Sequence, residues 1–296
     1  MDFFSVPERA IEAFERLTAT RVTVHDLRGS LQPFLPPERF QHMHPLCCAM
    51  KINHSDACID FDATRLRREI SAAPEGRVQM CFAGLVECVV PVFQNRELDW
   101  VLFAGPRLRG TALSCATRDD APPPRTSPWP CRTPLPSAIN DAEAQSLLEN
   151  LRQLAARLQL WHAQRPMSGA GTGLASARAP NAAADPLATR RAQIRSFIHA
   201  RHTQPVRLED LAEVLHLSES RAGHAVREAC GKTFLKLLTE ARLRTAAGLL
   251  QHTNVPVLEV GLRSGFGEIS HFHRSFRTRF KLSPLQYRKQ SEAARV

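Results

Sequence analysis

The segment VLEVGLRSGFGEISHFHRSFR, residues 257–277, predicts two short helices joined by a tight turn. Gly261 provides a small site where the second helix must cross the first closely, and Gly265 permits the backbone conformation of the turn. In the second helix Phe272 and Phe276 are four residues apart, so both rings face the core. The outward face is left polar and cationic, as insertion into the major groove of DNA requires.

A second copy of this pattern lies about 50 positions earlier in the chain. In LEDLAEVLHLS, residues 208–218, three leucines share one helical face and Ala212 takes the small site. Ser218 suits the N-cap of the following helix because its hydroxyl accepts a hydrogen bond from a nearby amide. Between the copies, residues 234–250 have the apolar spacing of a long amphipathic helix. The C-terminal third is therefore expected to be all-α, with two helix-turn-helix motifs.

The excess positive charge of the chain is confined to this region. The whole chain has 39 Lys and Arg against 29 Asp and Glu, and residues 190–296 hold 19 of these basic residues and 9 of the acidic ones. The first 189 residues are left with 20 of each sign. Because basic domains release counterions from DNA phosphates, this distribution favours a nucleic-acid partner for the C-terminal region. A solvated basic surface without a partner is the alternative.

Residues 190–290 closely resemble the DNA-binding domain of the AraC/XylS family of transcription regulators. The matching residues are Phe234, Leu238, Arg242, Leu243, Ala246, Leu249, Leu250, Gly265, Phe266, Ser270, Phe272, Arg274, Phe276, Ser283, Pro284, Tyr287 and Arg288. The resemblance implies a seven-helix domain whose two recognition helices enter successive major grooves. It also implies that the partners are double-stranded promoter DNA and RNA polymerase, and that the protein activates transcription rather than represses it.

The resemblance also assigns roles within each recognition helix. The first would present Ser220 and His224 to bases and Arg221 and Arg227 to phosphates. The second would present Ile269, Ser270, His273 and Arg274 to bases and Arg277 to the backbone. Ala222 and Val226 stand where larger apolar residues are usual, His224 stands where arginine is common, and Gly223 offers no side chain. We therefore expect the second helix to supply more of the sequence discrimination.

The N-terminal half has a different pattern. Two apolar runs, residues 88–93 and 100–104, bracket a polar turn at residues 94–96, which predicts an antiparallel pair of strands. A helix is expected over residues 63–71. The fold class predicted for the chain is α+β: a mixed α/β sensory domain, an amphipathic connecting helix, and the all-α domain.

Residues 42–108 resemble the PocR sensory domain, a PAS-like module thought to recognise small organic molecules. The matching residues include His42, Pro45, Cys47, Cys58, Asp62, Cys81, Ala83, Gly84, Leu85, Glu87, Pro91, Val92 and the segment 103–106. We expect an effector to bind at His42, Cys47, Cys58, Cys81 and Glu87, with no cofactor required. Phe82 stands where the family usually has histidine, which removes a polar group from the expected site.

A metal or thiol sensor is an alternative for the same residues. Soft thiolates select zinc, copper(I) or iron-sulfur clusters, and His42, Cys47, Cys58 and Cys81 would supply four ligands. The sequence has no closely spaced CxxC pair among them, and buried cysteine is commonly a small apolar residue. Both interpretations stay open on the sequence alone.

One helix connects the two halves. Ala144, Leu147, Leu151, Leu154, Leu158 and Trp161 alternate at spacings of three and four residues. The pattern fits the seam of a homodimeric coiled coil, and it also fits an amphipathic helix that folds back onto the first domain. Prolines and small residues on either side predict linkers. The expected divisions are a sensory domain at 1–116, a Pro-rich linker at 117–138, the helix at 139–165, a flexible linker at 166–189 and the DNA-binding domain at 190–290.

The sequence patterns argue against a membrane-spanning or secreted protein, and they argue against an enzyme. No apolar run reaches the roughly 20 residues of a membrane span, and the N-terminus lacks the apolar core of a signal peptide, so we expect a cytoplasmic protein with reduced cysteines. No catalytic residues stand out and no enzymatic activity is expected. Pro130-Cys131-Arg132 resembles the methyl-acceptor site of adaptive-response alkyltransferases, yet its proline-rich surroundings hold no base to activate the thiol.

The sequence therefore predicts a DNA-binding transcription regulator, activated by a small organic effector and paired as a homodimer. The rival interpretation is an architectural DNA-binding protein whose first half senses nothing.

Overall fold

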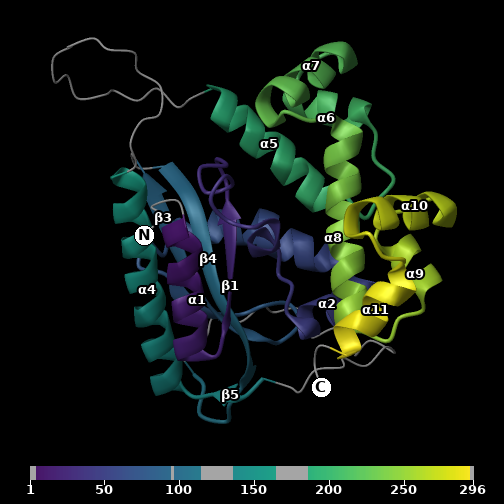
Figure 1. The fold of residues 1–296 in the computed structure, drawn as a ribbon. Coiled ribbons are helices and arrows are strands. Elements are labelled where there is room, and N and C mark those ends of the chain that lie inside the picture. Colours follow the sequence, from purple (N-terminus) through teal and green to yellow (C-terminus); the bar gives the residue numbers. More distant parts are fainter. Residues whose placement is uncertain (1–4, 95–96, 115–135, 165–185, 294–296) are drawn as a thin grey trace, which may run out of the picture.

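The computed structural model describes residues 5–94, 97–114, 136–164 and 186–293. An N-terminal half built on a single β-sheet lies beside a C-terminal half made of helices (Figure 1), which confirms the expected mixture of classes. Most of the expected linker at 117–138, including Cys131, falls outside these residues. Within the described ranges, no helix combines the length and the apolar character needed to cross a membrane.

Within the described residues the sheet has five strands, four of them in the antiparallel order β1-β4-β3-β2, and β5 pairs with β4 in parallel. The strands are β1 (Arg21–Asp26), β2 (Arg77–Met80), β3 (Val86–Gln94), β4 (Glu97–Arg109) and β5 (Ala138–Ile139). The hairpin of β3 and β4 is the predicted pair of strands. Alternate residues of β3 enter different cores, Val90 on one face of the sheet and Val89 on the other, because side chains alternate along a strand. The central strands are therefore buried on both faces.

Helices cover both faces of this sheet. On one face lie α1 (Val6–Thr18) and α4 (Asp141–Ala163) (Figure 1). On the other face, α3 (Leu66–Ile70) packs against the sheet; it follows α2 (Pro45–Ile59) and the π-helical segment η3 (Asp60–Arg65) in the chain. The short 3-10 turn η2 (Pro37–Phe40) contacts β1, and its Arg39 pairs with Glu8 and Glu15 of α1. The helix expected at 63–71 is thus the end of η3 followed by α3.

The apolar seam of α4 is not a dimer interface. Every residue of the seam is at most 6% exposed, from Ala144 at 0% to Leu147 at 6%, and all belong to the core between α4, α1 and the sheet. A capping box between Asn140 and Glu143 fixes where the helix begins. The homodimer interpretation of this helix is therefore wrong, because its seam is satisfied within the chain. The fold-back alternative is correct.

The C-terminal half is a domain of seven helices within the described residues, as expected. They are α5 (Pro186–Arg201), α6 (Leu208–Leu215), α7 (Glu219–Cys230), α8 (Phe234–His252), α9 (Val257–Arg263), α10 (Ile269–Phe280) and α11 (Pro284–Ala293). Helix α5 starts inside the linker expected at 166–189, which is a correction. Proline is well tolerated in the first turn of a helix, and Leu187 already packs against the core of this half.

The local signals of the two sequence patterns have the expected geometry. The Ser218 hydroxyl accepts a hydrogen bond from the amide of Arg221 at the start of α7. Gly265 has a φ of +93°, a conformation that side chains rarely adopt. A Cβ at Gly261 would lie 2.9 Å from Cδ1 of Phe272, so α10 crosses α9 as closely as the small site allows.

The two halves meet where α2 packs against α8 (Figure 1). Cys48 of α2 is 4% exposed and belongs to the same apolar core as Leu243 and Leu250 of α8. Met43, just before α2, joins this core, and a Cβ at Gly248 would lie within 2.4 Å of its terminal methyl carbon. The junction is therefore built from side chains of both halves.

Candidate DNA interface and sensory pocket

Helix α10 separates its apolar and polar side chains cleanly. Phe272 and Phe276 are fully buried, and their rings contact each other at a centroid distance of 5.6 Å. Four of the predicted contact residues are exposed: Ser270, His273, Arg274 and Arg277. Ile269 is half-buried and packs toward Gly261, so much of its side chain faces the core rather than solvent.

Helix α7 is arranged in the same way with smaller core residues. Ala222 and Val226 are fully buried. The four predicted contact residues of this helix are exposed: Ser220, Arg221, His224 and Arg227. Small side chains thus form the inner face of this helix, and Leu208 of α6 lies at an ordinary contact distance of 3.4 Å from where a Cβ of Gly223 would be.

The exposed arginines of these two helices are not neutralised by neighbouring carboxylates. In the described part of the helical half, the ion pairs join Lys232 to Glu240 at 2.8 Å and Arg263 to Glu259 at 3.1 Å. Arg221, Arg227, Arg274 and Arg277 take part in neither pair. Their charge is available to an anionic partner such as a DNA phosphate.

In the N-terminal half, the five predicted effector residues line one pocket. His42 comes from the loop before α2, Cys47 and Cys58 from α2, and Cys81 and Glu87 from the turn and strand that follow β2. Other residues around this sensory pocket include Met50, Asp62, Phe82, Leu85 and Pro106. Its volume is only about 20 Å³, enough for a water molecule or an ion.

Buried carboxylates surround His42 in this pocket. Asp62 Oδ2 lies 3.5 Å from His42 Nε2, and Glu87 Oε2 lies 3.9 Å from His42 Nδ1. The amide of Gln79 donates to Glu87 at 2.8 Å, and the thiol of Cys58 donates to Asp62 at 3.7 Å. These contacts place a polar network inside an apolar shell.

The pocket shifts two titration equilibria. Burial raises the pKa of Glu87 to about 8, and the nearby charge of Asp62 adds to the rise. Burial also raises the pKa of the Cys81 thiol well above its ordinary value, with a further contribution from Glu87. Both shifts favour the protonated forms of the Glu87 carboxyl group and the Cys81 thiol.

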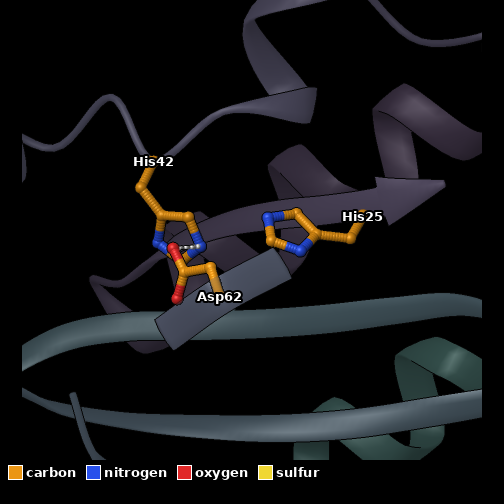
Figure 2. Close-up of side chains that lie close together, drawn as sticks. All are labelled: His25, His42 and Asp62. Atoms are coloured by element: carbon orange, nitrogen blue, oxygen red, sulfur yellow. Dashed lines mark ion pairs between the residues drawn. The ribbon is translucent and has the colours of Figure 1, made fainter. Parts of the chain in front are cut away.

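A different trio has the geometry of metal ligands. Atoms of His25, His42 and Asp62 all lie within 4.8 Å of one another, and Figure 2 shows both rings and the carboxylate brought together, with the His42–Asp62 ion pair dashed. Two histidines and one carboxylate are a donor set that suits zinc or iron(II). Among the described residues, Cys47, Cys58 and Cys81 do not join this group. The four-ligand set expected from the sequence is therefore not assembled in this structure.

Sequence reasoning missed His25 and gave Asp62 no role in the site. His25 lies on β1 and its ring contacts that of His42 at a centroid distance of 5.5 Å and that of Phe103 at 4.5 Å. The one local signal for His25 in the sequence is its place in an apolar strand, at a position where the side chain faces the interior. His199 of α5 lies 5.7 Å from His25, so the cluster reaches the helical half.

Comparisons with known proteins point to the same helical region. Residues 211–290 match the family model described as a helix-turn-helix domain. The chain is 31% identical over 97 residues to the uncharacterized HTH-type transcriptional regulator YdeC of Bacillus subtilis, covering 33% of each chain. It is 30% identical over 102 residues to the HTH-type transcriptional activator RhaS of an Enterobacter species, covering 34% of this chain and 37% of RhaS.

A solved structure matches the same share of the chain. The C-terminal domain of AraT, a response regulator from Geobacillus stearothermophilus, is 30% identical, with a TM-score of 0.34, covering 36% of this chain and 88% of that domain. The chain spans about a third of the length of the curated relatives it matches. The family match identifies residues 211–290 as a helix-turn-helix domain, and the similarity to the two transcription regulators is confined to about a third of this chain.

Proposed function

We propose that this protein is a sequence-specific transcription regulator in which α7 and α10 enter successive major grooves of promoter DNA. One observation carries the proposal: both helices bury an apolar face and expose polar residues, including Arg221 and Arg227 of α7 and Arg274 and Arg277 of α10. The helix pairs α6–α7 and α9–α10 serve as the two helix-turn-helix motifs. Helix α8 joins them as a rigid connector.

The two helices contribute unequally to reading the sequence. Helix α10 exposes Ser270, His273 and Arg274, which offer hydrogen bonds to base edges. Half-buried Gly223 borders the exposed face of α7 and has no side chain, so this helix offers fewer contacts to bases. Its arginines fit a role in positioning the domain on phosphates.

Duplex selection followed by binding measurements tests this proposal. The full chain selects its preferred site from random duplexes, and dissociation constants are then measured over a range of salt. Arg274→Ala should cost about 1–3 kcal/mol and relax specificity at one base pair, whereas Arg277→Ala should weaken all duplexes alike and lower the salt slope by about one. Failure to enrich any sequence, or equal losses for both variants on every duplex, would overturn the assigned roles.

The N-terminal half is proposed as a PocR-like, PAS-like sensory domain that makes the regulator respond to a small effector. Its support is the convergence of His42, Cys47, Cys58, Cys81 and Glu87 on one pocket, beside a helix that packs on α8. An effector acts by binding one arrangement of the two halves more tightly than another. Activation would then proceed through contact with RNA polymerase. The apolar seam of α4 is not available to pair two copies, since it is buried within the chain.

Metal responsiveness is a second candidate function, favoured by the trio of His25, His42 and Asp62. Cobalt(II) is a suitable probe because its absorption spectrum reports protein ligands, and its uptake by the full chain is measured spectroscopically. His25→Gln should abolish the cobalt spectrum and Cys47→Ser should leave it unchanged. The reverse result would indicate that the cysteines, rather than His25, are ligands of the metal.

A further inference from the structure

A cavity lies between the two halves of the chain. Its volume is about 250 Å³, against about 20 Å³ for the sensory pocket. Residues of β1 and the segment after it line one side, and residues of α5 and α8 line the other. This interdomain cavity is slightly below the ~300–1,000 Å³ of drug-sized sites, so its size suits a small metabolite.

The walls of the interdomain cavity differ in chemistry. The N-terminal wall includes the apolar side chains of Leu27, Leu35 and Phe40. The helical wall adds the cations Arg195 of α5 and Arg244 of α8, along with Lys232 from the turn before α8. The N-terminal wall also holds polar residues such as Gln32 and Gln41, but the lysine and arginine residues of the lining all come from the helical wall.

Most of the carboxylates at this cavity are already engaged. Both oxygens of Glu240 lie 2.8 Å from the ammonium of Lys232. Asp26 accepts hydrogen bonds from four backbone amides, those of residues 29, 30, 31 and 32. Neither carboxylate is placed primarily to neutralise the two arginines.

Arg195 and Arg244 are half-buried as whole residues, but the Nε atom of each is shielded from solvent. The Nε atoms of both are buried and have no hydrogen-bond partner among the described residues. Burial lowers the pKa of Arg244 from its ordinary value, and although Glu240 and Glu38 oppose this, the like charge of Arg195 lowers it further. Two guanidinium groups that repel each other in a shielded cavity are stabilised by an anion between them.

We propose that the interdomain cavity binds a small organic carboxylate with an apolar body. The carboxylate would contact Arg195 and Arg244, and the body would lie against Leu27, Leu35 and Phe40. Such a ligand contacts both halves at once, so it favours the arrangement in which β1 and α8 face each other across the cavity. This consequence for regulation rests on the proposed function, but binding of the ligand does not.

His25 places the cavity next to the sensory pocket. It lines the interdomain cavity, whereas its neighbours His42 and Asp62 line the sensory pocket. The trio thus forms the boundary between the two spaces. The larger space is where an organic body fits, and the smaller one has room for an ion or a water molecule.

Calorimetric titration of the full chain tests the proposal. Benzoate and hexanoate are the probes, and their uncharged amides, benzamide and hexanamide, are the matched ligands. At least one carboxylate should bind saturably below about 10 mM, with its amide at least about tenfold weaker because charge-assisted hydrogen bonds are lost. Absence of saturable carboxylate binding in that range, or equal affinity for acid and amide, would overturn the proposal.

Variants locate the binding. Arg195→Gln and Arg244→Gln should each weaken the carboxylate at least about tenfold, whereas Arg201→Gln, an exposed arginine of α5 outside the cavity, should not change it. If Arg244→Gln fails to fold by circular dichroism, Arg244→Lys keeps the charge and should retain measurable binding. Equal effects of Arg195→Gln and Arg201→Gln would refute the site. The duplex selection above uses no carboxylate, so DNA binding and ligand binding can fail separately.

Discussion

Replacement of Leu151 by alanine tests how α4 is stabilised. Leu151 is fully buried in the core that α4 shares with the sheet. Burial of a leucine side chain contributes about 1.5–3 kcal/mol, and the cavity left by truncation adds to the loss, so we expect Leu151→Ala to lower the free energy of unfolding by about 2–5 kcal/mol. Leu160 lies on the same helix and is 62% exposed, so Leu160→Ala should change it by less than about 0.5 kcal/mol.

Urea denaturation followed by tryptophan fluorescence measures both variants. Trp100 and Trp161 belong to the same core and report its unfolding. If the seam instead joined two chains, the unfolding midpoint would rise with protein concentration, because dimers are stabilised by mass action. A midpoint that depends on concentration, or equal losses for Leu151→Ala and Leu160→Ala, would refute the fold-back packing.

Two further predictions concern titration and backbone strain. Burial, with the nearby charge of Asp26, raises the pKa of Asp99 from 3.8 to about 6, so protonation favours the folded state and stability declines as pH rises from about 4 to about 6. Asp99→Asn should therefore be more stable than the parent at pH 8, with a gain that shrinks toward pH 4 in thermal melts. Gly265→Ala should destabilise far more than Gly231→Ala in urea titrations: both glycines have positive φ, but a Cβ at Gly265 would lie 2.4 Å from the carbonyl oxygen of His202, and Gly231 faces open space.

Features that depend on neighbouring residues could be predicted from the sequence. The cap at Ser218 and the turn at Gly265 act within a few residues, so their side chains and backbone preferences specify them locally. The hairpin of β3 and β4 is equally local, because two apolar runs flank a short polar turn. The resemblance to a known family then indicated how these helices assemble.

Features that depend on distant partners could not be predicted in the same way. The spacing of apolar residues in α4 predicts that one face of the helix is apolar. That face can be buried equally well against a sheet of the same chain or against a helix of a second copy. Likewise, His25 and Asp62 are 37 positions apart, and only the packing of η3 over β1 brings them to His42. The difference in volume between the two cavities also arises from the packing of whole elements.

The glycine at position 248 of α8 is related to the contact between the two halves. Glycine inside a helix costs roughly 1 kcal/mol relative to alanine, so Gly248 needs a structural reason. Met43 and Cys48 supply it, because they occupy the space that a side chain at position 248 would fill. Cys47, the neighbour of Cys48, lines the sensory pocket. Consecutive residues of one helix thus contact the pocket and the connector between the two DNA-reading motifs, so a shift of α2 at the pocket must be accommodated by repacking against α8.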